Sequence, residues 1–416
     1  MNESFTSYQK VVVGLLAFLQ FTVVLDFMVL APLGPLLIEG LRITTSQFGL
    51  LVSAYAFSAA TSGLLAAGFA DRFDRRRLLL TFYVGFILGT ALCAVATTYL
   101  ALLTARLITG FFGGVVGSII FAILADLIPL SMRGRAMGFV QTAFAASQVL
   151  GIPIGLSLAT RWGVNAAFVL VVALAVLAAT VIALKLQPVV GHLRGANAGR
   201  SPVAHLARTA TRPRYVAGFS ATMLLATGGF MLMPFGSTFL VQNLHVSMAQ
   251  LPVVYAVTGV TSILAGPVLG RASDSFGKYR TFAASSAVGT VLVVLYTGLT
   301  AANLGLVLGL NVALFLCISA RMVAASALTS ALPAPADRGA YMSISSSLQQ
   351  LAGGVAGWVA GLLIHQAKPT SPLENYARLG WIVAAAMVIA TGLMFNVSRL
   401  ITLEMARQRP LGEKSL

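Results

Sequence analysis

The sequence predicts an all-α membrane protein with twelve transmembrane helices in two pseudo-symmetric six-helix bundles. Of its 416 residues, 58% are hydrophobic and only 9% are charged. A soluble domain carries roughly 25% charged residues, so this chain has too little polar surface to face water. Its apolar residues fall in long runs, whereas a transmembrane β-barrel would show alternating segments of about 10 residues. In addition, the two halves of the chain carry similar loops.

The apolar runs are long enough for membrane-spanning helices, which need about 20 residues each. They lie at 11–38, 47–70, 78–97, 100–125, 136–158, 164–186, 215–241, 249–272, 281–300, 303–330, 340–364 and 378–401. The first run continues through Asp26 without a small-residue cleavage site, so we expect a retained helix and not a signal peptide. We therefore expect an N-terminal bundle, a linker, a C-terminal bundle and a tail, at 1–186, 187–214, 215–401 and 402–416.

The positive charges predict the orientation of these helices. Of 27 lysines and arginines, 21 lie on the side of the termini and the linker, 4 lie in the opposite loops, and Arg106 and Arg321 lie within spans. By the positive-inside rule, both termini and the linker are cytoplasmic. The formal charge of +16 is then mainly a topology signal and not a footprint for nucleic acid. We expect a multi-pass protein of the cell inner (cytoplasmic) membrane, in contact with lipid.

Two predicted cytoplasmic loops resemble each other. Residues 71–77 read Asp-Arg-Phe-Asp-Arg-Arg-Arg after the second run, and residues 274–280 read Asp-Ser-Phe-Gly-Lys-Tyr-Arg after the eighth. Parallel six-helix repeats of this kind place a substrate site near the membrane midplane, between the two halves. This arrangement indicates a transporter.

Four segments resemble motifs of the major facilitator superfamily, and the resemblance covers essentially the whole chain. Residues 67–76 are similar to the loop motif Gly-x-x-x-Asp-Arg-x-Gly-Arg-Arg, with alanine and Asp74 at its two glycine positions. Residues 102–110 resemble the helix-four arginine motif, and 151–155 resemble the exporters' glycine-proline motif with Ile-Pro in place of Gly-Pro. Residues 26–35 look like the first helix of bacterial efflux-type members. The resemblance implies that the second helix meets the eleventh, and the fifth meets the eighth, across the boundary between the halves.

Small residues recur at every fourth position on several runs. This spacing keeps them on one helix face, where two backbones can approach closely. We expect these stripes to line the boundary between the halves, and the alternative is close packing inside one half. The stripes are Ala54, Ser58, Ser62 and Ala66; Ser147, Gly151 and Gly155; Thr258, Ser262, Gly266 and Gly270; and Gly353, Gly357 and Gly361.

Asp26 and Arg106 are predicted to form a proton-coupling site. A charge near the bilayer centre costs about 2.5–3.5 kcal/mol on insertion scales, so such residues face a cavity or a partner. Since helices rise ~1.5 Å per residue, the two positions differ in depth by only several Å. An apolar setting favours a protonated carboxyl group and a nearby arginine favours a carboxylate, so this acid can exchange a proton. The alternative is a permanent ion pair that stabilises the N-terminal half.

Arg321 is the second intramembrane cation. No acidic partner is evident in the C-terminal spans, so we expect Arg321 to face a cavity and attract an anionic or polar substrate. The alternative is pairing near the cytoplasmic end. Further residues are predicted to line the substrate cavity, although each also fits ordinary helix packing. They are Gln20, Gln141, Asn311 and Phe230.

A mixed-charge cluster is predicted at the cytoplasmic ends of the helices. Charge pairs that form in only one conformation bias the equilibrium toward that conformation. The resemblance implies a latch that holds the outward-open state. The alternative is that the arginines only set topology and contact anionic lipid. The predicted latch residues are Asp71, Arg72, Arg75, Arg76, Asp126, Asp274 and Arg280.

Together these features predict a secondary active transporter that exports small organic molecules, such as drugs or sugars, in exchange for protons by alternating access. The alternative is a facilitator, or a proton-symport importer of a small polar or anionic solute, on the same fold. The four histidines and two cysteines form no catalytic or metal-binding pattern, so we expect neither an enzyme nor a cofactor. No Walker loop is present to bind ATP. We expect a monomer whose partners are the substrate, protons and membrane lipid.

Overall fold

The computed structural model describes residues 5–69, 73–190, 202–334 and 337–408, and within them it is helical, with no strand beyond one isolated bridge between His365 and Glu374. The first half contains α1 (Ser7–Val29), α2 (Gly34–Leu41), α3 (Thr45–Phe69), α4 (Arg75–Val95), α5 (Tyr99–Leu127), α6 (Leu130–Ala146), α7 (Ile152–Trp162) and α8 (Val164–Lys185). A short helix, α9 (Pro202–Ala210), follows in the predicted linker. The second half contains α10 (Pro213–Leu232), α11 (Gly236–Gln242), α12 (Leu251–Phe276), α13 (Lys278–Thr297), α14 (Leu304–Ala331), α15 (Arg338–Leu363) and α16 (Tyr376–Gln408).

Eleven helical segments in the described chain are long and apolar enough to cross a membrane. Two of them are compound, because α6 continues into α7 and α10 continues into α11. The predicted span at 340–364 corresponds to α15, which is long enough but carries Gln349, Gln350 and several serines. This helix packs against both α3 and α10, where Ser345 and Ser347 are buried, while the two glutamines are half-buried.

Both compound helices change their geometry beside a proline. A π-helical turn, Ser147–Gly151, joins α6 to α7 just before Pro153. A 3₁₀ turn, Met233–Phe235, joins α10 to α11 and contains Pro234. Proline has no backbone N–H to donate and its ring crowds the preceding turn, so the regular hydrogen-bond ladder is interrupted at both places.

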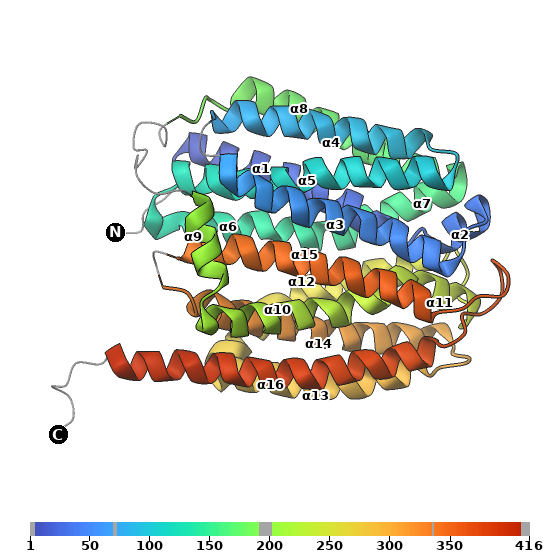
Figure 1. The fold of residues 1–416 in the computed structure, drawn as a ribbon. Helices are drawn as coiled ribbons and strands as arrows, with labels where there is room; N and C mark the ends of the chain where they lie inside the picture. Colours follow the sequence, from blue (N-terminus) through green and yellow to red (C-terminus); the bar gives the residue numbers. More distant parts are fainter. Residues whose placement is uncertain (1–4, 70–72, 191–201, 335–336, 409–416) are drawn as a thin grey trace.

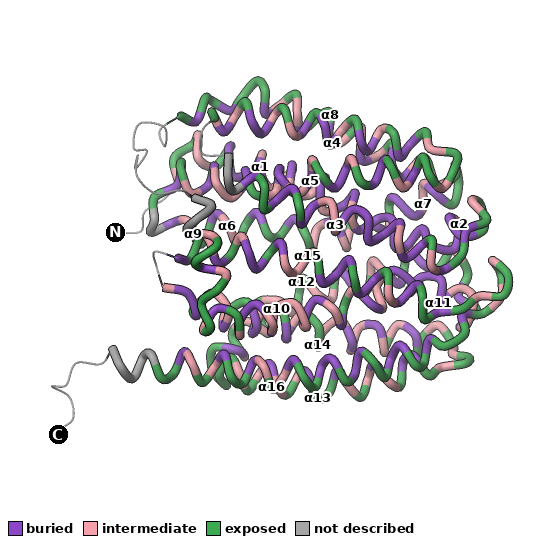
Figure 2. Tube along the Cα trace, viewed as in Figure 1, coloured by how far each residue is buried: buried purple, intermediate pink, exposed green. Residues whose placement is uncertain are grey.

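The helices form two bundles that meet along two seams. In the first half α5 packs on α3 and α4, and in the second half α10 and α13 pack on α16 (Figure 1). The seams pair α3 with α15, and α7 with α12. These are the second with the eleventh helix and the fifth with the eighth, so the predicted pairing is confirmed. Figure 2 shows exposed residues along α8 and α16, at opposite edges, as expected of helices that face lipid.

Two predicted stripes of small residues face neighbours in their own half and not the boundary between halves. Ser58 donates a hydrogen bond to the carbonyl oxygen of Leu107 on α5. Ser147 donates to the carbonyl of Phe21 on α1, and Gly151 lies against Leu25 of the same helix. For these stripes the expectation was wrong, because regular spacing reveals one close face of a helix but not which neighbour packs there.

The α3–α15 seam is formed by glycines of both helices. A Cβ atom added to Gly361 would lie 2.7 Å from the carbonyl oxygen of Thr45 and 3.1 Å from Cα of Gly49. One turn away, a Cβ atom on Gly357 would lie 3.0 Å from the hydroxyl of Ser53. The stripe on α15 therefore lines the boundary between the halves, as predicted, with different α3 residues opposite it.

The two halves are joined tightly at one end of the molecule, which carries α2, α7 and α11 and is called the α2 end. There a single hydrophobic core contains residues of both halves, and the ring of Phe48 packs edge-on against Phe235. Ser237 donates a hydrogen bond of 2.8 Å to the carbonyl of Ala31. Near the same end, the hydroxyl of Thr45 donates to the carbonyl of Ile364 at 2.7 Å.

At the opposite end, which carries α9 and is called the α9 end, each half has its own core. One buried cluster contains only residues 12–189 and another only residues 215–401. Along α12, Gly259 packs against Val149, but Gly266 and Gly270 on the same side have no neighbour within 4 Å. The halves are therefore packed together at the α2 end and part toward the α9 end.

Filling the α3–α15 seam should destabilise this packing. We expect Gly361→Ala to lower the free energy of unfolding by about 1–3 kcal/mol, because the new methyl group overpacks a backbone contact. Gly266→Ala is the matched control, since its Cβ enters open space and alanine favours a helix by roughly 1 kcal/mol. Thermal unfolding in detergent measures both, and equal effects would contradict the assignment of this seam.

Candidate functional site

Asp26 and Arg106 form a fully buried ion pair in the N-terminal half. Nη1 of Arg106, on α5, lies 2.7 Å from Oδ2 of Asp26, on α1, and both side chains are 0% exposed. The same nitrogen donates to the backbone carbonyl of Asp26 at 3.3 Å. The hydroxyl of Thr90, on α4, donates to Oδ1 of Asp26 at 3.1 Å. The sequence predicted the two charged residues of this site but not Thr90.

Glycine packing brings a fourth helix, α3, to the pair. A Cβ atom on Gly110 would lie 2.8 Å from Cα of Tyr55, so only a glycine allows α5 to approach α3 this closely. Tyr55 then lies beside Arg106, whose guanidinium carbon is 4.7 Å from the centroid of the tyrosine ring. A cation over an aromatic face gains about 2 kcal/mol when both are shielded from water.

Tyr55 begins an aromatic bridge to the other half of the molecule. Its ring centroid is 5.2 Å from that of Phe27, which lies 5.8 Å from that of Phe230 on α10. Phe230 in turn packs against Gly353 of α15. The ion pair is therefore connected to the boundary between the halves through three rings.

Of these rings, sequence reasoning identified Phe230 and missed Tyr55 and Phe27. The sequence contains a weak indication of a role for both missed residues. Phe27 directly follows Asp26, and Tyr55 is the one tyrosine of its apolar run. A tyrosine in such a run has a polar end that needs a partner.

Arg321 is buried and not exposed to a cavity as expected. The residue is 6% exposed, and its guanidinium carbon lies 5.4 Å from the ring centroid of Phe282. No carboxylate of the described chain lies within 4.0 Å of it, and its Nε has no hydrogen-bond partner there. An aromatic face on α13 thus takes the place that an acid occupies in the other half.

The other predicted cavity residues do not gather at one site. Asn311 donates to the hydroxyl of Tyr296 and to the carbonyl of Val307, so it joins helices within the C-terminal half. Gln141 is exposed on α6. Gln20 is half-buried on α1, and its side-chain oxygen has no partner in the described chain.

The structure describes five of the seven predicted latch residues. Asp71 and Arg72 lie outside the described residues. Nε of Arg75 lies 3.2 Å from Oδ2 of Asp126, with the arginine side chain 6% exposed, and Arg76 donates to the carbonyl of Ala183. In the second copy, Asp274 and Arg280 are exposed and form no ion pair with a described residue.

Asp74, which stands at a motif glycine position, caps a helix. Its carboxylate accepts hydrogen bonds from the backbone N–H of Arg76 at 3.0 Å and of Val189 at 2.9 Å. A side-chain oxygen at this position satisfies one of the free N–H groups of the first turn. The residue therefore begins α4 and ties it to the segment after α8.

Neutralising one member of the buried pair should be costly. We expect Asp26→Asn and Arg106→Gln each to lower stability by about 3–5 kcal/mol, because each leaves an uncompensated buried charge or donor. The double variant should lose less than the sum, since both charges are then absent. Unfolding in detergent tests this, with the exposed Asp274→Asn as control. Additive losses would contradict a direct pair.

The cap on α4 gives a second test. Asp74→Ala should cost about 0.5–2 kcal/mol and speed hydrogen exchange at the amide of Arg76, whereas Asp74→Asn should retain most of the cap. Arg77→Ala is the control, because its pair with Asp74 spans 4.0 Å and its side chain is 90% exposed. Similar losses in the alanine and asparagine variants at position 74 would contradict the capping role.

Comparison with known proteins agrees with this architecture. A family model described as Major Facilitator Superfamily matches residues 16–234 and 218–413. The chain is 30% identical over 270 residues to the uncharacterised MFS-type transporter YceJ of Bacillus subtilis, covering 63% of this chain and 66% of that protein. It is 24% identical over 363 residues to a probable sugar efflux transporter of Mannheimia succiniciproducens, covering 86% and 87%. It is also 27% identical over 273 residues to a chloramphenicol efflux pump of Mycobacterium tuberculosis, covering 65% and 62%.

Solved structures share the fold. A bacterial homologue of the human lysosomal transporter Spinster, in an inward-facing and unoccupied conformation, superposes with a TM-score of 0.76 at 17% identity, covering 96% of this chain and 99% of that one. The xylose transporter XylE of E. coli, in a partially occluded inward-open conformation, gives a TM-score of 0.73 at 16% identity, covering 94% and 98%. Because the family model covers nearly the whole chain, this protein belongs to the major facilitator superfamily and is a membrane transporter.

Proposed function

We propose that this transporter exports small organic molecules in exchange for protons, and that Asp26 is the residue that binds the proton. The buried Asp26–Arg106 pair carries this proposal. A charge in an apolar interior is tolerated only with a partner, so adding a proton to the aspartate removes the group that holds Arg106. The freed guanidinium is then available to a substrate or to another acceptor.

The aromatic bridge supports a link between this proton and the movement of the halves. Arg106 lies over Tyr55, and Phe27 joins that ring to Phe230 of the other half. A change in the position of Arg106 therefore alters contacts across the boundary. Proton binding biases the two conformations only through such differences in contact free energy.

The packing of the halves is consistent with a conformation open to the cytoplasm, in which an exporter binds its substrate and an importer releases it. In the proposed orientation, with both termini in the cytoplasm, the α9 end is cytoplasmic and the α2 end faces outward. The halves part toward the α9 end, which is the side where an exporter loads its substrate. The related sugar and chloramphenicol efflux proteins favour a small organic molecule as that substrate.

We propose further that the charge pairs at the α9 end belong to a latch. Arg75 and Asp126 hold α4 against α5 within one half in the present conformation. Asp274 and Arg280 are exposed there, so they are free to meet a partner when the halves close at this end. Twelve membrane-spanning helices can form a complete pathway within one chain, so we expect the protein to act as a monomer in the inner membrane.

A second candidate is a facilitator or a proton-symport importer on the same fold. The observation that favours it is that both carboxylate oxygens of Asp26 have a partner, Oδ2 in Arg106 and Oδ1 in a hydrogen bond from Thr90. A carboxylate held by both a guanidinium and a hydroxyl is well suited to a purely structural role. In that case Arg106 and Asp26 would stay paired throughout transport.

Proton movement in proteoliposomes distinguishes these functions. A pH-sensitive dye inside the vesicles reports proton flux when chloramphenicol, ethidium, a pentose or benzoate is added. We expect at least one compound to drive protons in the opposite direction to itself, and we expect Asp26→Asn to reduce this flux to the level of protein-free liposomes. Glu39→Gln, which changes an exposed acid on α2, should retain it.

Two other outcomes of this experiment correspond to the second candidate function. Substrate uptake without proton flux, unchanged in Asp26→Asn, would make the protein a facilitator and Asp26 a structural residue. Proton and substrate movement in the same direction would make it a symporter. Either result would overturn the proposal.

A further inference from the structure

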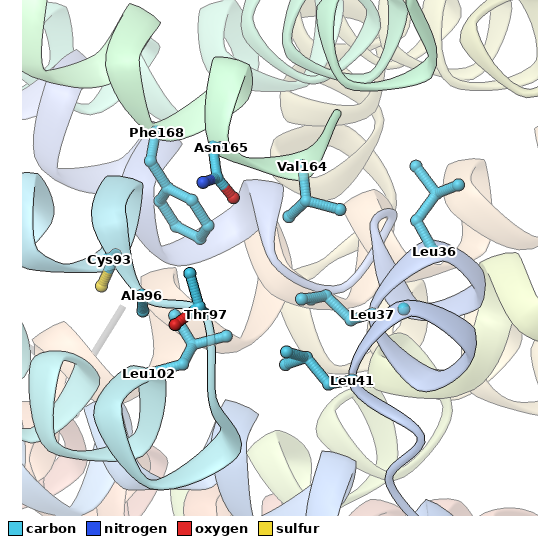
Figure 3. Close-up of a pocket in the computed structure, with 11 residues that line it drawn as sticks. Leu36, Leu37, Leu41, Cys93, Ala96, Thr97, Leu102, Val164, Asn165 and Phe168 are labelled. Atoms are coloured by element: carbon cyan, nitrogen blue, oxygen red, sulfur yellow. The ribbon is translucent and has the colours of Figure 1, made fainter. Parts of the chain in front are cut away.

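A cavity lies inside the N-terminal half at the α2 end, away from the boundary between the halves. It has a volume of about 310 Å³ and lies between α2, the turn from α4 to α5, and the start of α8 (Figure 3). Leu37 and Phe168 form apolar walls, and Thr97 and Asn165 supply exposed polar groups. Cys93 also lines the cavity and is only 1% exposed, so it lies at the inner limit of this space.

Polar groups continue from this cavity to the ion pair along one face of α4. Thr97 lies two residues beyond the end of α4, and Cys93 and Thr90 lie three residues apart on one face of that helix. The last of them donates its hydroxyl hydrogen bond to Oδ1 of Asp26. Oδ2 of the same carboxylate is held by Arg106, so Oδ1 is the oxygen on the side of α4.

The inner end of the cavity, at Cys93, also lies against α5 close to the ion pair. Sγ of Cys93 lies 3.9 Å from the hydroxyl of Thr109, which is three residues after Arg106 on α5. Nε and Nη2 of Arg106 are buried without a hydrogen-bond partner in the described chain. Buried donors of this kind destabilise the folded protein unless a water molecule satisfies them.

We propose that this cavity is a water-filled entrance through which protons from the α2 end reach Asp26. The proposal rests on the proposed function, in which Asp26 binds the transported proton. A hydronium ion at the floor of the cavity gives up a proton and remains as water, and the hydroxyl and thiol groups at the narrow point relay a proton to Oδ1, each giving up one proton as it takes one, so that an O–H bond forms on Asp26. Proton and substrate then approach the ion pair by separate routes, one through the N-terminal bundle and one between the halves.

The narrow point at Cys93 is consistent with this role. Asp26 and Arg106 are 0% exposed, so a short barrier of Thr90, Cys93 and Thr109 separates the pair from the water of the cavity. An open channel at this place would let protons leak across the membrane without substrate. A hydroxyl and thiol lining supplies hydrogen-bonding groups for proton movement while limiting the passage of larger solutes.

The accessibility of Cys93 tests the entrance directly, because the chain has only one other cysteine, Cys317. In the Cys317→Ser protein, reconstituted in oriented proteoliposomes, a membrane-impermeant methanethiosulfonate reagent is added from either side. Thiols left unmodified are then counted with a maleimide after denaturation. We expect modification from the α2 side to be at least about tenfold faster than from the α9 side, because the reactive thiolate forms only where water reaches it.

Three further variants test whether the reagent reaches Cys93 through this cavity. Ala96→Phe, at the cavity wall, should slow modification of Cys93, whereas Ala283→Phe, at a separate surface cavity of the C-terminal half, should not. Asn165→Cys, in a protein lacking both native cysteines, should react from the α2 side and shows that the reagent enters the cavity.

Three results would contradict the proposal that this cavity is a water-filled entrance for protons. They are modification only from the α9 side, an unreactive Cys93 when Asn165→Cys reacts, and an Ala96→Phe variant that labels at the original rate. None of these measurements depends on transport. A protein that labels as expected but carries no proton flux would contradict the proposed function and leave the water entrance in place.

Discussion

The cost of placing charge in an apolar interior determines how the N-terminal half is built. Asp26 and Arg106 are both fully buried, so each must satisfy the other, and α1 and α5 are held at the distance that their side chains require. Thr90 then brings α4 to the remaining carboxylate oxygen. Gly110 allows α3 to approach and place Tyr55 against the guanidinium. Four helices of one bundle are thus positioned by a single pair of charges.

The C-terminal half solves the same problem differently. Arg321 has no acid beside it in the described chain, and it lies over the ring of Phe282 instead. An aromatic face stabilises a cation without creating a group that can take up a proton. The two halves are similar in the order of their helices but not in the chemistry of their intramembrane cations, because among the described residues Arg106 is paired with a carboxylate and Arg321 is not.

Much of this architecture could be predicted from the sequence. Apolar runs of sufficient length revealed the helices, and the rarity of intramembrane charges singled out Asp26 and Arg106. Their meeting followed from similar depth in the membrane, which is set by helix rise alone. The pairing of α3 with α15, and of α7 with α12, was implied by the family resemblance and is confirmed by the packing.

Features that depend on helix rotation could not be predicted. The stripes containing Ser58 and Ser147 face α5 and α1, because periodicity identifies a close face without naming its neighbour. Arg321 was expected in a cavity since no acid was available, but aromatic partners leave little trace in an apolar sequence. Tyr55 escaped notice for the same reason, although it links the ion pair to the other half.

The hydrogen bonds that join the two halves at the α2 end have one more consequence. Both hydrogen bonds described there run from a hydroxyl side chain to a backbone carbonyl, from Ser237 to Ala31 and from Thr45 to Ile364. A carbonyl is present whatever side chain its residue carries, so these hydrogen bonds require the hydroxyl side chains of the two donors, whereas the two acceptor residues are constrained only by their burial. Adaptation of this transporter to new compounds can therefore alter one side of the closure without changing its hydrogen bonds.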